Sequence, residues 1–136
     1  MSKYTNQILL SIFFSILISI IFTNHILSGF NNLIILLVII GLILSFLNKE
    51  KKISPYLKLA FLNSLIFSLL FSLVFFINFF STDSQFRENY NNFFAFLKLI
   101  PIFIVEFLFI GLIVFFGNLA GMVIREIIIK LKNRSN

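Results

Sequence analysis

The sequence contains no cysteine and no tryptophan, and only one histidine, among its 136 residues. The absence of cysteine excludes disulfides, thiol redox chemistry and cysteine-based metal sites. One histidine cannot complete a zinc site of the usual ligand count without several carboxylates, and Asp and Glu together number only 5. Neither a glycine-rich phosphate loop nor a nucleophile elbow occurs. We therefore expect no metal ion, no cofactor and no enzymatic activity.

Charge is scarce as well, because 12% of the residues are charged whereas 60% are hydrophobic. A soluble domain of this length could not bury so much apolar surface. The apolar residues form continuous runs without the alternation of an outer-membrane barrel, and about 20 helical residues cross a hydrocarbon core of ~30 Å. The sequence therefore predicts an all-α integral membrane protein, multi-pass in the cell (plasma) membrane, whose first partner is the lipid bilayer.

The apolar runs predict a bundle of four transmembrane helices that forms one membrane domain. The first run could instead serve as a cleavable signal peptide, but residues 24–30 contain no A-x-A-like cleavage site. Tyr4, Tyr56 and Tyr90 flank the runs and suit the membrane interface. Within the domain of residues 1–136, the predicted spans are 8–27, 30–47, 59–80 and 102–124.

The fourth run is longer than a span requires. A helix over residues 93–129 would be about 55 Å long, so we divide the run. Pro101 lacks an amide donor and disfavours helix in the residue before it, which predicts an interfacial or bent segment at 93–100. After the span, we expect the basic tail 125–136 to continue as a helix in the cytoplasm.

The Lys and Arg residues are distributed unevenly between the two ends of the predicted spans. If there are four spans, all 11 of these residues except Arg87 and Lys98 lie on one side of the membrane. Basic residues next to spans favour the cytoplasm, so both termini should be cytoplasmic. The net charge of +6 then reflects topology rather than a nucleic-acid partner. The residues expected to contact anionic lipid headgroups are Lys49, Lys51, Lys52, Lys58, Arg125, Lys130, Lys132 and Arg134.

Small residues recur at every fourth position in two of the predicted spans. Membrane helices associate through close packing and interhelical hydrogen bonds, which favour small residues at the contact. Since residues four apart share one helix face, we predict that the first and third spans pack face to face; chance spacing in a serine-rich sequence is the alternative. The two ladders are Ser11, Ser15, Ser19 and Thr23, and Ala60, Ser64, Ser68 and Ser72.

Two further small-residue patterns lie in the second and fourth spans. Gly117 and Gly121 are four residues apart, and Gly41 and Ser45 have the same spacing. Glycine lets another backbone approach closely. These patterns predict helix contacts, but they leave open whether the contacts lie within one chain or between copies.

The two halves of the chain resemble each other weakly. "LLSIFFSILISIIF" matches "LNSLIFSLLFSLVF" at an offset of 53, and "FNNLIILL" resembles "YNNFFAFL" at an offset of 60. A duplicated helical hairpin would give a parallel repeat with its axis along the membrane normal. Low sequence complexity is an equally good explanation.

Glu106 is the one acidic residue within a predicted span. An ionised side chain there costs at least ~2.5 kcal/mol, so such residues usually face a partner or water. Lys98 and Asn118 are candidate members of a polar site around it, although Lys98 is about 12 Å away along a straight helix. The alternative is a carboxyl group that snorkels outward or remains protonated.

The architecture resembles that of the small multidrug transporters, which also have four spans and one membrane glutamate. The resemblance ends there, because their glutamate lies in the first span and Glu106 lies in the fourth. We expect a small non-enzymatic membrane protein that acts by helix–helix interaction with another membrane protein or with itself, as an accessory or immunity-type subunit. The alternative is a self-assembling pore or small carrier, holin-like or cation/proton-coupled, that uses Glu106.

Overall fold

The computed structural model describes residues 5–23, 30–48 and 50–134, and every regular element in these ranges is a helix. The all-α prediction is therefore confirmed. The predicted second span coincides with α2, and the basic tail continues the last helix without a break as far as Arg134. The elements are α1 (Thr5–Thr23), α2 (Phe30–Leu47), α3 (Ile53–Thr82), α4 (Ser84–Asn89), α5 (Phe93–Leu97) and α6 (Leu99–Arg134).

The structure divides the helix at Lys98 rather than at Pro101. Lys98 separates α5 from α6 although its own backbone angles are helical, and Pro101 lies in the first turn of α6. Proline fits there because the amides of a first turn have no intrahelical acceptor. Asn92 begins the short α5, since its side-chain oxygen accepts a hydrogen bond from the Ala95 amide at 2.8 Å. The sequence had not predicted α4.

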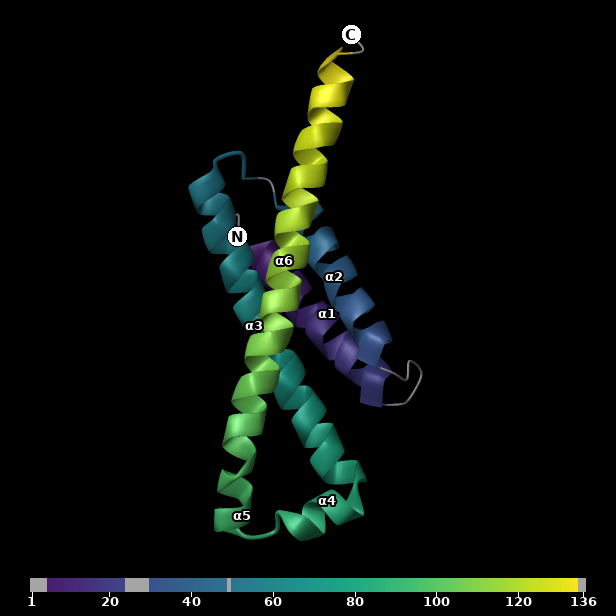
Figure 1. Cartoon of the computed structure of the whole chain (residues 1–136), viewed down its shortest axis with the longest axis vertical. Helices are drawn as coiled ribbons and strands as arrows, with labels where there is room; N and C mark the ends of the chain where they lie inside the picture. The colour runs from purple at the N-terminus through teal and green to yellow at the C-terminus, as the bar shows by residue number, and fades with distance from the viewer. Residues whose placement is uncertain (1–4, 24–29, 49, 135–136) are drawn as a thin grey trace.

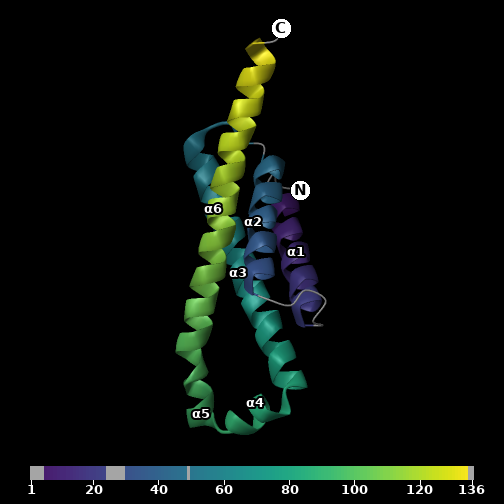
Figure 2. The same ribbon diagram turned by 45° about the vertical axis from the view of Figure 1, so that its right-hand side comes forward.

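α1 runs antiparallel to α2, and α3 runs antiparallel to α6; the second of these two pairs is the longer (Figure 1). α1 packs mainly against α3 and α2 mainly against α6, while α3 and α6 also contact each other. The α1–α2 pair stops well short of the turn formed by α4 and α5 in both views (Figures 1 and 2). In that region α3 and α6 diverge, and α4 with α5 joins their ends. We call this the α4–α5 end of the molecule.

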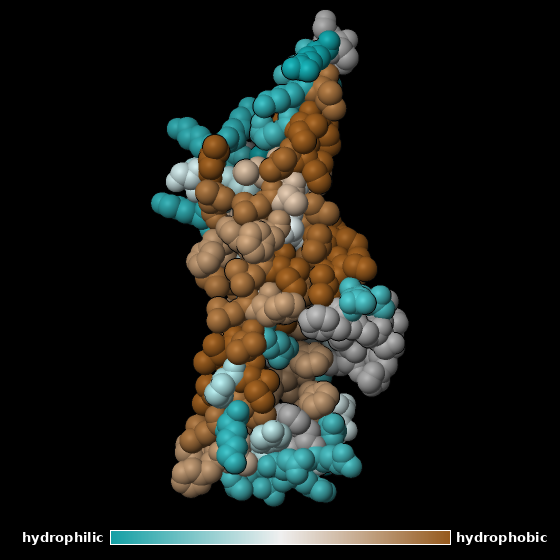
Figure 3. Space-filling model, in the orientation of Figure 1, coloured by the Kyte–Doolittle hydropathy of each residue, from teal (hydrophilic) through white to brown (hydrophobic). Residues whose placement is uncertain are grey.

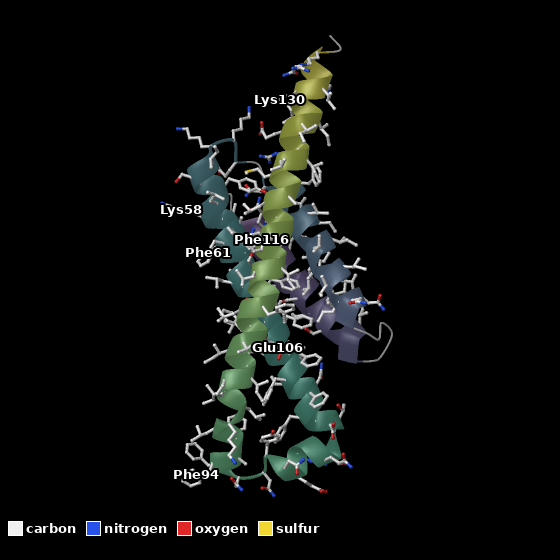
Figure 4. The ribbon with its side chains drawn as sticks, viewed as in Figure 1. Lys58, Phe61, Phe94, Glu106, Phe116 and Lys130 are labelled. Atoms are coloured by element: carbon white, nitrogen blue, oxygen red, sulfur yellow. The ribbon has the colours of Figure 1, made fainter. Side chains whose placement is uncertain are left out.

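The opposite end, which we call the basic end, holds the start of α3 and the C-terminal part of α6 (Figure 1). Lys58 and Lys130 mark it in Figure 4. Arg87 and Lys98 belong to the α4–α5 end, so the basic residues in the described ranges divide between the two ends as the sequence predicted. Lys3 and Lys49 lie outside the described residues. The other basic residues at the basic end are Lys51, Lys52, Arg125, Lys132 and Arg134.

The surface between the two ends is largely apolar (Figure 3). Phe61 and Phe116, for example, are 56% and 62% exposed. Two segments are long and apolar enough to cross a membrane, namely α3 and the run Phe93–Arg134, while the apolar parts of α1 and α2 are shorter. Exposed apolar bands of this extent are typical of surfaces that contact lipid or another protein. The buried apolar core consists of Ile18, Leu37, Ile40, Leu44, Phe67, Phe71, Ile110 and Val114.

Candidate functional site

The serine ladder of α1 is completely buried. Ser11, Ser15 and Ser19 are each 0% exposed. Each hydroxyl donates to a carbonyl of its own helix, at 3.0, 2.7 and 2.7 Å respectively, which satisfies the polar group within an apolar contact. Ser19 Oγ also lies 3.4 Å from the carbonyl oxygen of Phe71 in α3. The side chain of Thr23 lies outside the described part of the chain.

The ladder of α3, Ala60 to Ser72, is buried as well, and α1 packs mainly against α3, but one member of the ladder also borders α6. A Cβ atom added at Gly111 of α6 would lie 3.1 Å from Ser68 Oγ. Ser68 therefore borders α6, so the ladder of α3 is not confined to the α1 contact that its spacing had led us to expect. Ser64 and Ser68 donate to carbonyls of their own helix at 2.8 and 3.1 Å.

The small residues of α2 and α6 pack against each other within the chain. A Cβ atom added at Gly41 would lie 2.7 Å from the Asn118 amide nitrogen, and one added at Gly117 would lie 2.7 Å from the Val38 carbonyl oxygen. One added at Gly121 would lie 2.5 Å from Ser45 Cβ. The two patterns that the sequence left unassigned thus meet each other in one internal contact.

A buried hydroxyl joins three helices beside this contact. The Tyr56 hydroxyl of α3 lies 2.6 Å from Ser45 Oγ of α2. It also lies 2.8 Å from the side-chain oxygen and 2.9 Å from the carbonyl oxygen of Asn118 in α6. Since a phenol carries one proton, Tyr56 donates to an Asn118 oxygen and accepts from the Ser45 hydroxyl. Tyr56 is 1% exposed, so this interaction is shielded from solvent.

Arg125 extends this polar network at the basic end. Its guanidinium donates to the carbonyl oxygens of Asn48 and Glu50, the latter at 3.1 Å, and lies 5.4 Å from the centre of the Tyr56 ring. A cation at a helix C-terminus complements the free carbonyls there, and α2 ends at Leu47. The structure thus gives the half-buried Arg125 partners within the chain, and its contact with a lipid headgroup stays a prediction. Its predicted companions Lys51, Lys52, Lys58, Lys130, Lys132 and Arg134 are exposed.

The first helix joins the network through Gln7. Its side-chain nitrogen donates to the Leu47 carbonyl at 2.7 Å, and its side-chain oxygen accepts from Asn63 at 3.5 Å. Sequence reasoning missed the roles of Gln7, Asn48 and Tyr56. The sequence did contain one indication of their roles. All three residues lie near the ends of predicted spans, on the same predicted side of the membrane, where their side chains could meet.

Removal of the Tyr56 hydroxyl tests the network. Tyr56→Phe should lower the free energy of unfolding in detergent by about 1–2 kcal/mol, because the oxygens of Asn118 lose a buried donor. Tyr56→Leu should cost more, since it also removes the ring beside Arg125. Thermal unfolding followed by circular dichroism measures both. Equal stability of the Phe variant and the wild type would show that the hydroxyl contributes nothing.

The three members of the predicted polar site are not brought together. Asn118 belongs to the network at the basic end, whereas Glu106 lies 12 residues earlier on α6, about 18 Å along the helix. Lys98 is the residue between α5 and α6. Glu106 instead borders a cavity of 190 Å³ near the α4–α5 end, with side chains of α3, α6 and the α4–α5 turn around it.

Comparison of the chain with protein-family models, curated proteins and solved structures gave no match. A functional assignment therefore has to come from its own residues and contacts.

Proposed function

We propose that the protein is a non-enzymatic membrane protein of four spans that acts by binding another membrane protein through helix–helix contact, as an accessory or immunity-type subunit. The proposal rests on one observation, which is that the buried polar side chains form their hydrogen bonds within the chain. Ser45, Tyr56, Asn118 and Arg125 bond to one another or to backbone within the chain. The apolar surface of the helices is therefore the extended feature left for recognition.

The lengths of the helices support four spans. α1 has 19 residues and α2 has 18, which correspond to about 28 and 27 Å of helix. A tilted or slightly thinned bilayer accommodates such lengths. The antiparallel order of the four long helices, with most basic residues at one end, supports a cytoplasmic location for both termini.

An apolar groove between α3 and α6 suits a transmembrane helix of the partner. The groove has a volume of 160 Å³. Gly111, which is partly exposed and has no side chain, would let a partner backbone approach, and Phe61 and Phe115 would pack together against one side of that partner. Phe61 and Phe115 already stack edge to face, with ring centres 6.2 Å apart.

A pore or carrier that uses Glu106 is the second candidate, because this residue borders a cavity. The distribution of polar groups weighs against it. Between Glu106 and Asn118, α6 carries apolar residues and glycines only. A continuous polar path along α6 would need groups that this stretch lacks.

The two functions make different demands on Glu106. If the protein is an accessory subunit, Glu106→Gln should co-purify the same native membrane partner as the wild type, with unchanged cellular function. Affinity purification from native membranes identifies the bound partner, and light scattering after size exclusion gives the oligomeric state. Loss of cellular function in the Gln variant, with expression and partner binding unchanged, would favour the carrier. A homo-oligomer of fixed size without a partner would favour the pore.

The proposed topology is tested separately with reporter fusions. Fusions at Lys51 and Asn136 should report the cytoplasm, and a fusion at Ser84 should report the opposite side. A non-cytoplasmic reporter at Asn136, with Lys51 cytoplasmic, would mean that the second half crosses the membrane an odd number of times.

A further inference from the structure

A second cavity lies at the basic end, between the start of α3 and the C-terminal part of α6. Its volume is 260 Å³, whereas an engineered cavity of about 150 Å³ already holds benzene. Figure 3 shows hydrophilic side chains at this end, beyond the apolar band of the surface. The cavity therefore has room for a polar group at the border of that band. Its lining residues are Glu50, Lys51, Lys52, Ile53, Tyr56, Met122, Arg125 and Glu126.

Three cationic side chains border this cavity. Arg125 is held in place, because its guanidinium donates to two backbone carbonyls and lies against the Tyr56 ring. Lys51 and Lys52 are exposed and come directly before α3. Lys52 is the N-cap residue of that helix, and its side chain does not cap the first amides. The positive end of the helix adds to the field of the three cations, and together these groups suit a phosphate.

Two carboxyl groups border the same cavity, although a site for a simple anion would not require them. Glu126 is exposed on α6, and Glu50 is half-buried before α3. In the described part of the chain no side chain pairs with Glu126. A carboxylate repels a phosphate and attracts a cation. The lining therefore matches a ligand that carries both charges better than it matches an anion alone.

We propose that this cavity binds a phosphodiester that carries a primary ammonium group, which is the chemistry of a glycerophosphoethanolamine headgroup. The phosphate contacts Lys51, Lys52 and Arg125. The ammonium group donates to Glu126, and Glu50 adds to the negative charge of the lining. A primary ammonium has three N–H donors, which carboxylate oxygens accept in charge-assisted hydrogen bonds. A trimethylammonium group has no such donors, so phosphocholine fits less well.

A membrane lipid and a soluble glycerophosphodiester can both supply this group. The apolar part of the lining favours the lipid, because Ile53 is 68% exposed and Met122 is partly exposed. Acyl chains of a bound lipid can continue from these residues along the apolar band. The inference rests on the proposed membrane location, with the basic end at the level of the headgroups. It does not depend on a partner protein, so lipid binding can fail while partner binding holds.

The test is native mass spectrometry of the full chain in uncharged detergent, titrated with dioleoyl lipids that differ only in the headgroup. Phosphatidylethanolamine should bind about fivefold more tightly than phosphatidylcholine. Glu126→Gln should abolish this preference by raising the Kd for phosphatidylethanolamine alone. Lys51→Met should raise both Kd values about threefold, because both lipids carry the phosphate. Lys130→Met, an exposed position on α6 outside the cavity, should change neither.

Glycerophosphoethanolamine without acyl chains separates the two sources. If it displaces phosphatidylethanolamine only at much higher concentration, the lipid is the ligand; if it binds as tightly, a soluble phosphodiester is. Equal affinity for the ethanolamine and choline lipids would overturn the proposal. Tighter binding of phosphatidylglycerol than of phosphatidylethanolamine would overturn it too, because positive charge alone would then explain binding. So would an unchanged preference in a Glu126→Gln variant that melts like the wild type.

Discussion

Gly41→Ala should destabilise the folded protein by about 3 kcal/mol or more, an effect out of proportion to one methyl group. The added Cβ atom would lie 2.7 Å from the Asn118 amide nitrogen and 2.8 Å from the Gly117 carbonyl carbon. These are backbone atoms of α6, which cannot turn aside as a side chain can. The two helices would have to move apart, and overpacking of this kind is expensive.

Gly111→Ala is the matched control, because it adds the same methyl group to a helical glycine of the same protein. There the nearest atom is Ser68 Oγ at 3.1 Å, the end of a short side chain that can rotate. Alanine also favours helix over glycine by up to about 1 kcal/mol. The stability of this variant should therefore stay within about 1 kcal/mol of the wild type. Unfolding midpoints in detergent compare the two, and equal losses would mean that α2 and α6 do not pack through Gly41.

The helices themselves could be predicted from the sequence because they depend on local signals. The apolar run 30–47 has polar residues on both sides and became α2 without adjustment. The break near Pro101 was misplaced, because proline fits the first turn of a helix as well as it ends one. The helix therefore begins at Leu99, before Pro101.

The polar network could not be predicted because it depends on which helices are neighbours. Tyr56 and Asn118 are 62 residues apart, and their contact follows only once α3 and α6 are placed side by side. The separation of Glu106 from Asn118 was predictable, since 12 residues of one helix span about 18 Å. Glu106 faces aromatic side chains of α3, which α6 alone could not reveal.

Basic residues near a span end cannot be told apart from the sequence. The structure distinguishes them by their contacts and their exposure. Arg125 and Lys130 are five residues apart on α6, and both were expected at lipid headgroups. Arg125 donates to the carbonyls of Asn48 and Glu50, whereas Lys130 is exposed. Arginine suits the inner position because its planar fork reaches two acceptors at once.

Arg125→Met should therefore lower the free energy of unfolding in detergent by about 2 kcal/mol, because the charge-assisted hydrogen bonds to the end of α2 disappear. Lys130→Met removes the same charge from the same helix and should change stability by less than about 0.5 kcal/mol. Arg125→Lys should fall between them, since a single ammonium can neutralise the helix end without bridging both carbonyls. Chemical unfolding in an uncharged detergent measures all three without anionic headgroups. If Arg125→Met and Lys130→Met were equally stable there, the guanidinium would not hold α2 against α6. Both residues would then belong to the lipid surface.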